Sequence, residues 1–502
     1  MPYQMGDGVF GAFIVQDPEN DPYTADADNY VTQDIVVGLS DWMRYSSDTI
    51  YRYTSQFGFD LWPLTHYISL INGQQDFSFV VTQGSTYRLR IYCATVEFGY
   101  RLFLTGGHRM TVIAADGALV QPTQTDFLDI YSGERYDVLV TADQEVGTYL
   151  LLANILSFTG KLQKEIIYGS FIYEGDISDV DEVVTNQLEA FNKADPTLTL
   201  LDQHKLVAYR NEITGKFNDD YQTLPGPKDV IADPWVYKTT SYAVVNESQF
   251  QFMDSWDNFF HHKTLTEPTP LLFLGDNKEL EKRTIEERRE IVVSAYSNSS
   301  LTHSATIGPR LQFLELGETI DIVFQNAPTE DNELSLFNAY HPMHIHGHYF
   351  WSLASGLGVF DADAAAASAN FEDPPMRDNV VVPPHSWVLV RLQANNPGLW
   401  LMHCHTETHA MFGMMTILVV GDAAERPTPS DDLAMCGVGH TPNRPESLSV
   451  LTVLNLTGLI VIVTLAASAL FLWIRRRREF LLPYHRVHIL GRRHCGRPRR
   501  NS

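Results

Sequence analysis

Cysteine is scarce in this sequence. The 502 residues include four cysteines, too few for the disulfide framework that is common in extracellular proteins. Basic residues are also few, since 36 lysines and arginines stand against 61 aspartates and glutamates. Ten of the arginines lie in residues 475–502, which leaves 26 basic and 60 acidic residues in the rest of the chain. So acidic a balance favours solubility and attraction of cations, and gives no indication of nucleic-acid binding.

Extended runs punctuated by glycine and proline dominate most of the chain. Residues 76–96, "DFSFVVTQGSTYRLRIYCATV", and residues 318–328, "ETIDIVFQNAP", are rich in β-branched and aromatic residues. Residues 386–402 read as a strand, an Asn-Asn-Pro-Gly turn and a second strand. With 44% hydrophobic residues and a prior of about 150 residues per domain, the chain can form two or three domains. The pattern predicts an all-β fold of β-sandwiches.

The segment "HCHTETHAMFGM", residues 403–414, suggests a metal site. In an extended chain, neighbouring side chains point to opposite faces, so His403 and His405 would face one way and Cys404 the other. A cysteine, two histidines and a weak methionine ligand form the set used by electron-transfer copper sites. Cys404, His409 and Met414 supply three members of that set.

A second segment, "HPMHIHGH", residues 341–348, can supply the missing imidazole. His344 and His346 are two residues apart and can share a face, whereas His341 lies an odd number of residues away and can face elsewhere. A single histidine is usually structural, but seven candidates in two short clusters favour metal binding. His348 has no assigned role, and Met402, Met411 and Met415 are expected to pack in the core.

These two motifs resemble the third and fourth copper motifs of the multicopper oxidases, which include laccases, ascorbate oxidase and ferroxidases. The resemblance continues through "PPMRDNVVVPPHSWVLVRLQANNPGLWLMHCH" and, more weakly, through "LINGQQDFSFVVTQGSTYRLRI" and "GGHRMTVIAADG". It implies a copper cofactor, with four ions in the complete enzyme. It assigns a type 1 copper to His341, Cys404, His409 and Met414, a type 2 copper to His344, and a type 3 pair to His346, His403 and His405.

The resemblance also implies the fold and its boundaries. We expect tandem cupredoxin-like Greek-key β-sandwiches followed by a C-terminal transmembrane helix. The expected parts are a remnant of a first cupredoxin domain (1–23), a second cupredoxin-like domain (24–170), a linker (171–204), a third cupredoxin-like domain with the copper motifs (205–425), a stalk (426–447), a transmembrane helix (448–474) and a basic cytoplasmic tail (475–502).

Four of the eight histidines that the family's trinuclear cluster needs are missing. The family supplies them from two His-x-His motifs in an N-terminal domain, and residues 1–340 contain no such motif. His66 and His108 are isolated in segments that the family does not use for copper, and His261 and His262 are adjacent. The type 1 site is therefore complete and the trinuclear site is half represented. Either the sequence is a fragment, or the chain cannot build the oxygen-reducing cluster.

Residues 448–474 form 27 consecutive residues without a charge, longer than the roughly 20 that a bilayer-spanning helix needs. The arginines that follow predict a cytoplasmic tail and copper domains outside a plasma membrane.

Residues 1–20 contain no signal peptide, so we expect the start to lie upstream. Asn246 and Asn298 head glycosylation sequons. Cys93 is expected to be a buried thiol.

Three functions fit the sequence. The first is a membrane-anchored, laccase-like oxidase that takes single electrons from phenols or diphenols and passes them through Cys404 to dioxygen. The second is a ferroxidase that oxidises Fe(II). The third is a truncated copper-binding module without catalysis. Glu407 and Asp378 lie beside the copper motifs, where they either orient histidines and relay protons or form plain salt bridges.

Overall fold

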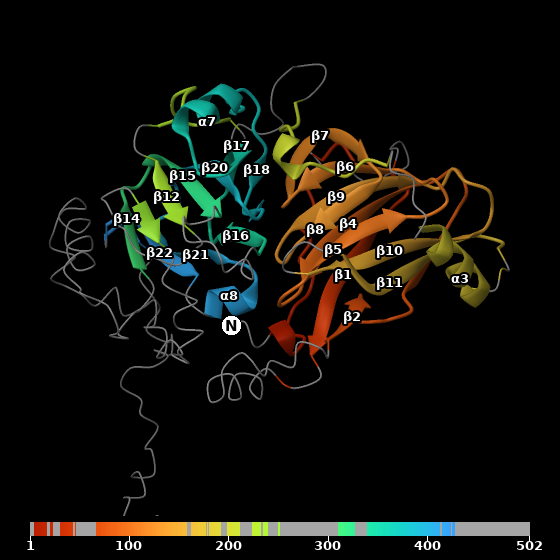
Figure 1. Ribbon diagram of the computed structural model, residues 1–502. Helices are drawn as coiled ribbons and strands as arrows, with labels where there is room; N and C mark the ends of the chain where they lie inside the picture. The colour runs from red at the N-terminus through yellow and green to blue at the C-terminus, as the bar shows by residue number, and fades with distance from the viewer. Residues whose placement is uncertain are drawn as a thin grey trace, which may run out of the picture. The chain divides into compact units, whose positions relative to one another are not determined.

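The computed structural model describes most of residues 5–426, in two successive β-sandwiches (Figure 1). The described residues are 5–17, 21–23, 31–43, 46, 67–157, 162–176, 178, 180–191, 198–210, 223–231, 234–238, 249–251, 310–326, 339–411, 414–422 and 424–426.

The first sandwich packs a six-stranded sheet against a five-stranded one. The larger sheet has the order β2-β1-β4-β9-β6-β7 and the smaller one β3-β11-β10-β5-β8. Most neighbours are antiparallel, but β1 runs parallel to β4 and β3 parallel to β11. The strands are β1 (Gln33–Met43), β2 (Tyr67–Ile71), β3 (Ser78–Val81), β4 (Thr86–Ala94), β5 (Gly99–Leu104), β6 (Met110–Ala115), β7 (Ala118–Thr125), β8 (Phe127–Ile130), β9 (Arg135–Thr141), β10 (Thr148–Leu156) and β11 (Leu162–Tyr173).

The second sandwich repeats this architecture. Its sheets have the orders β13-β12-β15-β20-β17-β18 and β14-β22-β21-β16-β19. Its strands are β12 (Trp235–Lys238), β13 (Gln249–Gln251), β14 (Arg310–Leu314), β15 (Thr319–Asn326), β16 (His341–Ile345), β17 (Phe350–Leu357), β18 (Met376–Arg377), β19 (Asn379–Val382), β20 (Ser386–Gln393), β21 (Gly398–Cys404) and β22 (Met415–Val420). Within the described residues, the named helices are α3 (Val180–Phe191), the 3₁₀-helix η3 (Gln203–Lys205), α7 (Ala362–Ser368) and α8 (Glu407–Met411).

The three segments that the sequence predicts to be extended contain strands. β3 and β4 occupy residues 76–96, β15 occupies residues 318–328, and β20 and β21 flank the Asn-Asn-Pro-Gly turn. β20 and β21 belong to opposite sheets of the second sandwich, so this turn carries the chain from one sheet to the other. The prediction of an all-β protein built from β-sandwiches is confirmed for the described residues.

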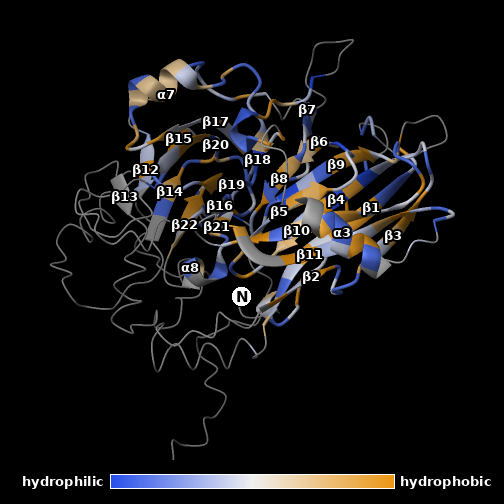
Figure 2. Ribbon diagram, turned by 45° about the vertical axis from the view of Figure 1, so that its right-hand side comes forward, coloured by the Kyte–Doolittle hydropathy of each residue, from blue (hydrophilic) through white to orange (hydrophobic). Residues whose placement is uncertain are grey.

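Each sandwich has its own apolar core. Hydrophobic residues are concentrated in the strands (Figure 2), where they meet between the two sheets. The first core includes Leu89, Val138 and Leu151, all fully buried. The second includes Phe324 and also Cys404, which is 0% exposed. The metal-site cysteine therefore lies inside a hydrophobic core, where water is excluded.

The observed boundaries differ from the expected ones at both ends of the linker. β11 continues past residue 170 to Tyr173, because Tyr173 is buried and pairs with Val81 of β3. After η3, residues 206–209 lie along β7 of the first sandwich, where Ala208 bridges to Val120. Leu206 is buried in the first core, which holds this segment to the first sandwich although the sequence places it in the domain that follows.

None of the helices within the described ranges is long and apolar enough to span a membrane. The expected transmembrane helix at 448–474, the stalk, the basic tail, Asn246 and Asn298 all lie outside the described residues. Those expectations remain predictions from the sequence.

Candidate metal centre

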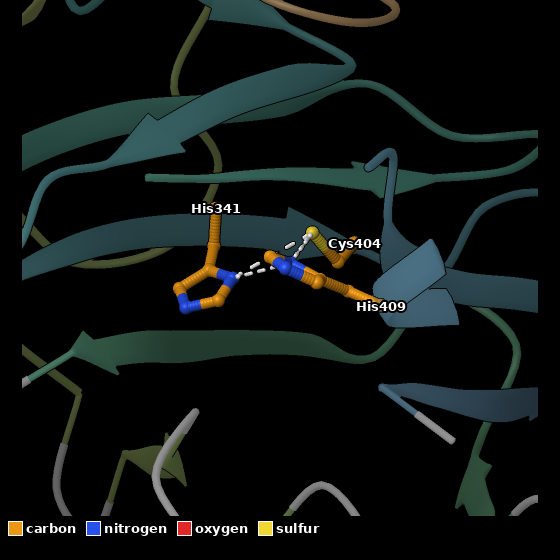
Figure 3. A group of neighbouring side chains, drawn as sticks. All are labelled: His341, Cys404 and His409. Carbon is orange, nitrogen blue, oxygen red and sulfur yellow. Dashed lines mark hydrogen bonds between the residues drawn. The ribbon is translucent and has the colours of Figure 1, made fainter. Parts of the chain in front are cut away.

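His341, Cys404 and His409 converge inside the second sandwich (Figure 3). The Cys404 Sγ lies 3.7 Å from His341 Nδ1 and 3.6 Å from His409 Nδ1. The two Nδ1 atoms are 3.1 Å apart. All three side chains are buried. We call these three residues the cysteine cluster.

Strand pairing brings the cysteine cluster together. β16 and β21 are antiparallel, with Met343 opposite Cys404, so these two side chains point to the same face of the sheet. His341 lies two residues before Met343 and shares that face. The chain then turns into α8, which carries His409 back over the sulfur. Met414 follows, where its N–H donates to the His409 carbonyl and its side chain is fully buried.

The donor set and its spacing fit one metal ion. Metal bonds of about 2.0–2.1 Å to imidazole nitrogen and about 2.3 Å to thiolate sulfur allow ligand atoms to lie up to about 4.1–4.4 Å apart. The three observed separations are all shorter than this. Burial and the neighbouring His409 lower the pKa of His341 well below its usual value, and burial lowers the pKa of His409 to about 4. Both imidazoles are therefore neutral and able to bind a metal at pH 7.

Four further histidines face each other on the other side of the same two strands. His344 lies directly opposite His403 in the pairing of β16 with β21. The centroid of the His344 ring lies 4.9 Å from that of His346 and 5.6 Å from that of His405. His346 Nε2 lies 3.0 Å from His403 Nε2. The strands therefore place His344 and His403 on one face and Cys404 on the other, as the alternation of side chains in the two motifs predicts. We call these four residues the histidine cluster.

Hydrogen bonds set the orientation of two of these rings. His344 Nδ1 lies 2.6 Å from the Asp378 carbonyl oxygen, and His403 Nδ1 lies 2.7 Å from the Cys404 carbonyl oxygen. A carbonyl oxygen can only accept, so in both rings Nδ1 carries the proton and Nε2 keeps its lone pair. Both rings therefore present Nε2 as a potential ligand atom. His346 is exposed, so the histidine cluster is accessible from one side.

Asp378 links the first sandwich to His344 of the histidine cluster. Arg135 of β9 donates to both carboxylate oxygens of Asp378 at 2.6 Å, while the Asp378 backbone accepts from His344. Asp378 therefore both forms a salt bridge and orients a histidine, the two roles that the sequence left open. Burial, and then the charge of Asp116, raise its pKa to about 6.

Glu407 lies at the boundary of the two sandwiches beside the cysteine cluster. Its backbone N–H donates to the Val96 carbonyl of the first sandwich at 2.9 Å. Burial raises the pKa of its carboxyl group to about 7, and Asp41 adds to the effect. The pKa of the Cys404 thiol is raised to about 12, mainly by burial and further by the charges of Glu97 and Glu407.

The remaining candidates lie apart from both clusters. Met402 is in the second core, Met415 is partly buried, and the side chain of Met411 lies outside the described set. His348 packs its ring edge-on against Trp400, with its Nδ1 3.2 Å from the His346 carbonyl oxygen. His108 hydrogen-bonds inside the first sandwich. The prediction of a buried Cys93 thiol is confirmed.

The two clusters are expected to differ in the protons that they release on binding Cu(II). The Cys404 thiol keeps its proton at pH 7, so binding at the cysteine cluster should release about one proton per ion. Burial and neighbouring imidazoles lower the pKa of His344 to about 4 and that of His405 to about 3. These rings are already neutral, so binding at the histidine cluster should release almost none.

Titration calorimetry in buffers of different ionisation enthalpy, on the wild type and on Cys404→Ser, measures these protons. Serine has no acidic thiol, so the variant should lose the release assigned to the cysteine cluster. Equal proton release from both proteins would contradict the assignment of Cys404 as a thiolate ligand.

A cysteine sulfur and two imidazoles around one position in a β-sandwich define the class of electron-transfer copper proteins. Family models described as multicopper oxidase match residues 33–175 and 275–424, which together make up more than half of the chain. The chain belongs to the multicopper oxidase family. Members of this family bind copper and use dioxygen to oxidise reducing substrates.

Individual relatives agree with the family. The chain is 28% identical over 378 residues to an L-ascorbate oxidase of Cucurbita pepo var. melopepo, covering 74% of this chain and 63% of that protein. It is 28% identical over 363 residues to laccase-6 of Arabidopsis thaliana, covering 70% and 61%. The solved structure of Fet3p, a multicopper oxidase that functions in iron import, has the same fold, with a TM-score of 0.56 at 21% identity over 83% of this chain and 70% of Fet3p. The chain thus spans a little over 60% of the length of the two enzymes.

Proposed function

We propose that this chain carries the copper-binding part of a membrane-anchored, laccase-like oxidase that takes single electrons from phenols or diphenols and passes them to dioxygen, forming water. One observation carries the proposal. Cys404 places its sulfur in the cysteine cluster, while the residues bonded to it on either side, His403 and His405, belong to the histidine cluster. An electron accepted at the first cluster would therefore have only a few covalent bonds to cross.

We assign the ligands as the family resemblance implies. The type 1 copper would be held by His341, Cys404 and His409, with the buried Met414 as a weak fourth ligand. His344 would hold the type 2 copper, and His346, His403 and His405 the type 3 pair. Bound copper would supply the one-electron chemistry that these side chains lack. The exposure of His346 leaves one side of the histidine cluster free for the additional imidazoles that a trinuclear cluster needs.

The protein holds the proposed electron path between paired strands and excludes water from it. β21, which ends at Cys404, is paired on both sides, with β16 and with β22. The Cys404 N–H donates to the Met414 carbonyl at 3.0 Å, which fixes the backbone at the sulfur. Since Cys404 is fully buried, water is excluded from the sulfur. Of the two cluster imidazoles, His409 is the more accessible, at 6% exposed against 1% for His341, so we propose that the electron donor approaches His409.

Iron oxidation is the second candidate, favoured by the acidic composition of the chain. Outside residues 475–502 it carries 60 acidic against 26 basic residues, a balance that would attract Fe(II). The anchor at 448–474 and the extracellular position of the copper domains are proposed from the sequence for either function.

Oxygen uptake tests the proposal, measured on copper-loaded protein in which this chain is joined to the two His-x-His motifs that the family's trinuclear cluster needs. With a diphenol as donor, uptake is expected to exceed that of Cys404→Ser by at least about 10³-fold, because the variant breaks the path between the clusters. Faster uptake with Fe(II) than with the diphenol would favour the ferroxidase. A chain that shows the blue absorption band but consumes no oxygen with either donor would overturn both functions and leave the copper-binding module.

A further inference from the structure

A loop of the first sandwich contacts the copper-motif sandwich along its whole length. Residues 131–134, which join β8 to β9, are called here the interface loop. The Tyr131 ring stacks on Tyr340 with centroids 5.0 Å apart and planes 11° apart. Glu134 accepts from the buried Arg377 at 3.0 Å. The loop is thus fixed against the second sandwich at both of its ends.

Ser132, in the middle of the interface loop, contributes to the protonation of His405, whose ring also hydrogen-bonds to its own backbone. Its hydroxyl contacts two groups, the Thr95 carbonyl oxygen and, at 3.1 Å, His405 Nδ1. The carbonyl contact is the shorter one, and a carbonyl can only accept, so the single hydroxyl proton goes to Thr95. Ser132 Oγ must then accept from His405, which places the ring proton on Nδ1. The lone pair of His405 is left on Nε2.

Gly133 fixes the position of the same ring. A Cβ atom at this residue would lie 2.3 Å from His405 Cδ2 and 2.6 Å from Asn379 Nδ2. Its φ of +80° is also a backbone conformation that glycine adopts without strain. The loop backbone therefore packs directly against the imidazole, and no larger residue fits. The carbonyl of Ser132 accepts from Asn379 Nδ2 at 3.0 Å, which holds the loop in this place.

We propose that Ser132 and Gly133 hold His405 in the tautomer and orientation that bind metal, so that the first sandwich sets the copper affinity of the histidine cluster. The inference rests on the proposed function only in identifying the metal as copper. Ser132 is a positioning residue that acts through His405. The sequence offered no sign of it, since Ser132 and His405 are 273 positions apart.

The tautomer is tested first, on the metal-free complete chain. Nitrogen-15 NMR of histidine-labelled protein, with His405 assigned by its loss in His405→Gln, should show the proton on Nδ1 in the wild type. Ser132→Ala should move a large share of that proton to Nε2, and Ser132→Thr, which keeps a hydroxyl, should restore the wild-type signal. An unchanged His405 signal in Ser132→Ala would overturn the inference, whatever the function of the chain.

Copper affinity is tested next, by competition with a chelator. Loss of a group that orients a metal-binding histidine typically lowers affinity 10–100-fold, and we expect Ser132→Ala to lose this much at the histidine cluster. The blue absorption of the cysteine cluster should be unchanged. The matched control is Ser386→Ala, which removes a buried hydroxyl that donates to the Pro383 carbonyl away from the histidine cluster.

Two results at this stage would contradict the proposal. The first is a copper affinity of Ser132→Ala equal to that of the wild type. The second is an equal loss of copper affinity at both clusters together with a lower melting temperature, which would indicate a general structural role. Absence of the blue band from the wild type would instead contradict the proposed function, and the tautomer experiment would still decide the role of Ser132.

Discussion

Replacing Cys404 by serine is expected to abolish the intense blue absorption of the copper-loaded chain and its oxidation of donors. The band arises from charge transfer between a thiolate and copper, and a serine hydroxyl cannot replace the sulfur that lies 3.6–3.7 Å from both imidazoles. The same substitution removes the sulfur end of the proposed electron path. Visible absorption and steady-state oxygen uptake, measured on one preparation, report both losses.

Cys93→Ser is the matched control for this experiment. Cys93 is also a buried, free thiol, but it lies in the core of the first sandwich, 3.4 Å from the Thr95 hydroxyl. The control variant should keep the blue band at full intensity. Survival of the band in Cys404→Ser, or its loss in Cys93→Ser, would place the copper at a different sulfur.

Replacing Arg377 by methionine is expected to destabilise the chain by about 3–5 kcal/mol, because it leaves buried charges without a partner. Arg377 is 1% exposed and donates to Asp116 at 2.6 Å and to Glu134 at 3.0 Å. Burial opposes ionisation of Asp116, but the charges of Arg377 and Arg135 outweigh it and lower the pKa of that carboxyl group. The free energy of unfolding by urea measures the effect.

Arg101→Met provides the comparison. Arg101 pairs with Asp129 at 2.6 Å, but its side chain is 24% exposed, and pairs in contact with solvent usually contribute less than about 1 kcal/mol. If Arg377→Met proved no more costly than Arg101→Met, the buried network would not hold the two sandwiches together. Since Arg377 joins the second sandwich to the interface loop, we also expect its loss to weaken copper binding at the histidine cluster.

The sequence predicted which residues of each motif share a face, because alternation along a strand is local. Alternation along a strand fixes which of His403, Cys404 and His405 share a face, and no distant contact is needed to derive it. The pairing of His344 with His403 then follows from the antiparallel register of β16 and β21. The strands at 76–96, 318–328 and 386–402 were also predictable, since β-branched runs and turn residues carry the signal.

The contacts between the sandwiches could not be predicted in this way. Ser132 and Gly133 lie in an ordinary turn sequence and Arg135 begins β9, and their contacts with His405 and Asp378 depend on how one sandwich packs on the other. No periodicity encodes packing between segments some 250 residues apart. The packing of Leu206 in the first core could not be predicted for a related reason, because it is a tertiary contact.

The most direct test of the account is a crystal structure of the copper-loaded chain, with the ions located by anomalous diffraction at the copper edge. We predict one copper bound by Cys404 Sγ and by the Nδ1 atoms of His341 and His409, and separate copper density facing the Nε2 atoms of His344, His403 and His405. Density for a single shared ion, or a copper bound away from Cys404, would contradict the central claim that this cysteine joins two distinct metal sites.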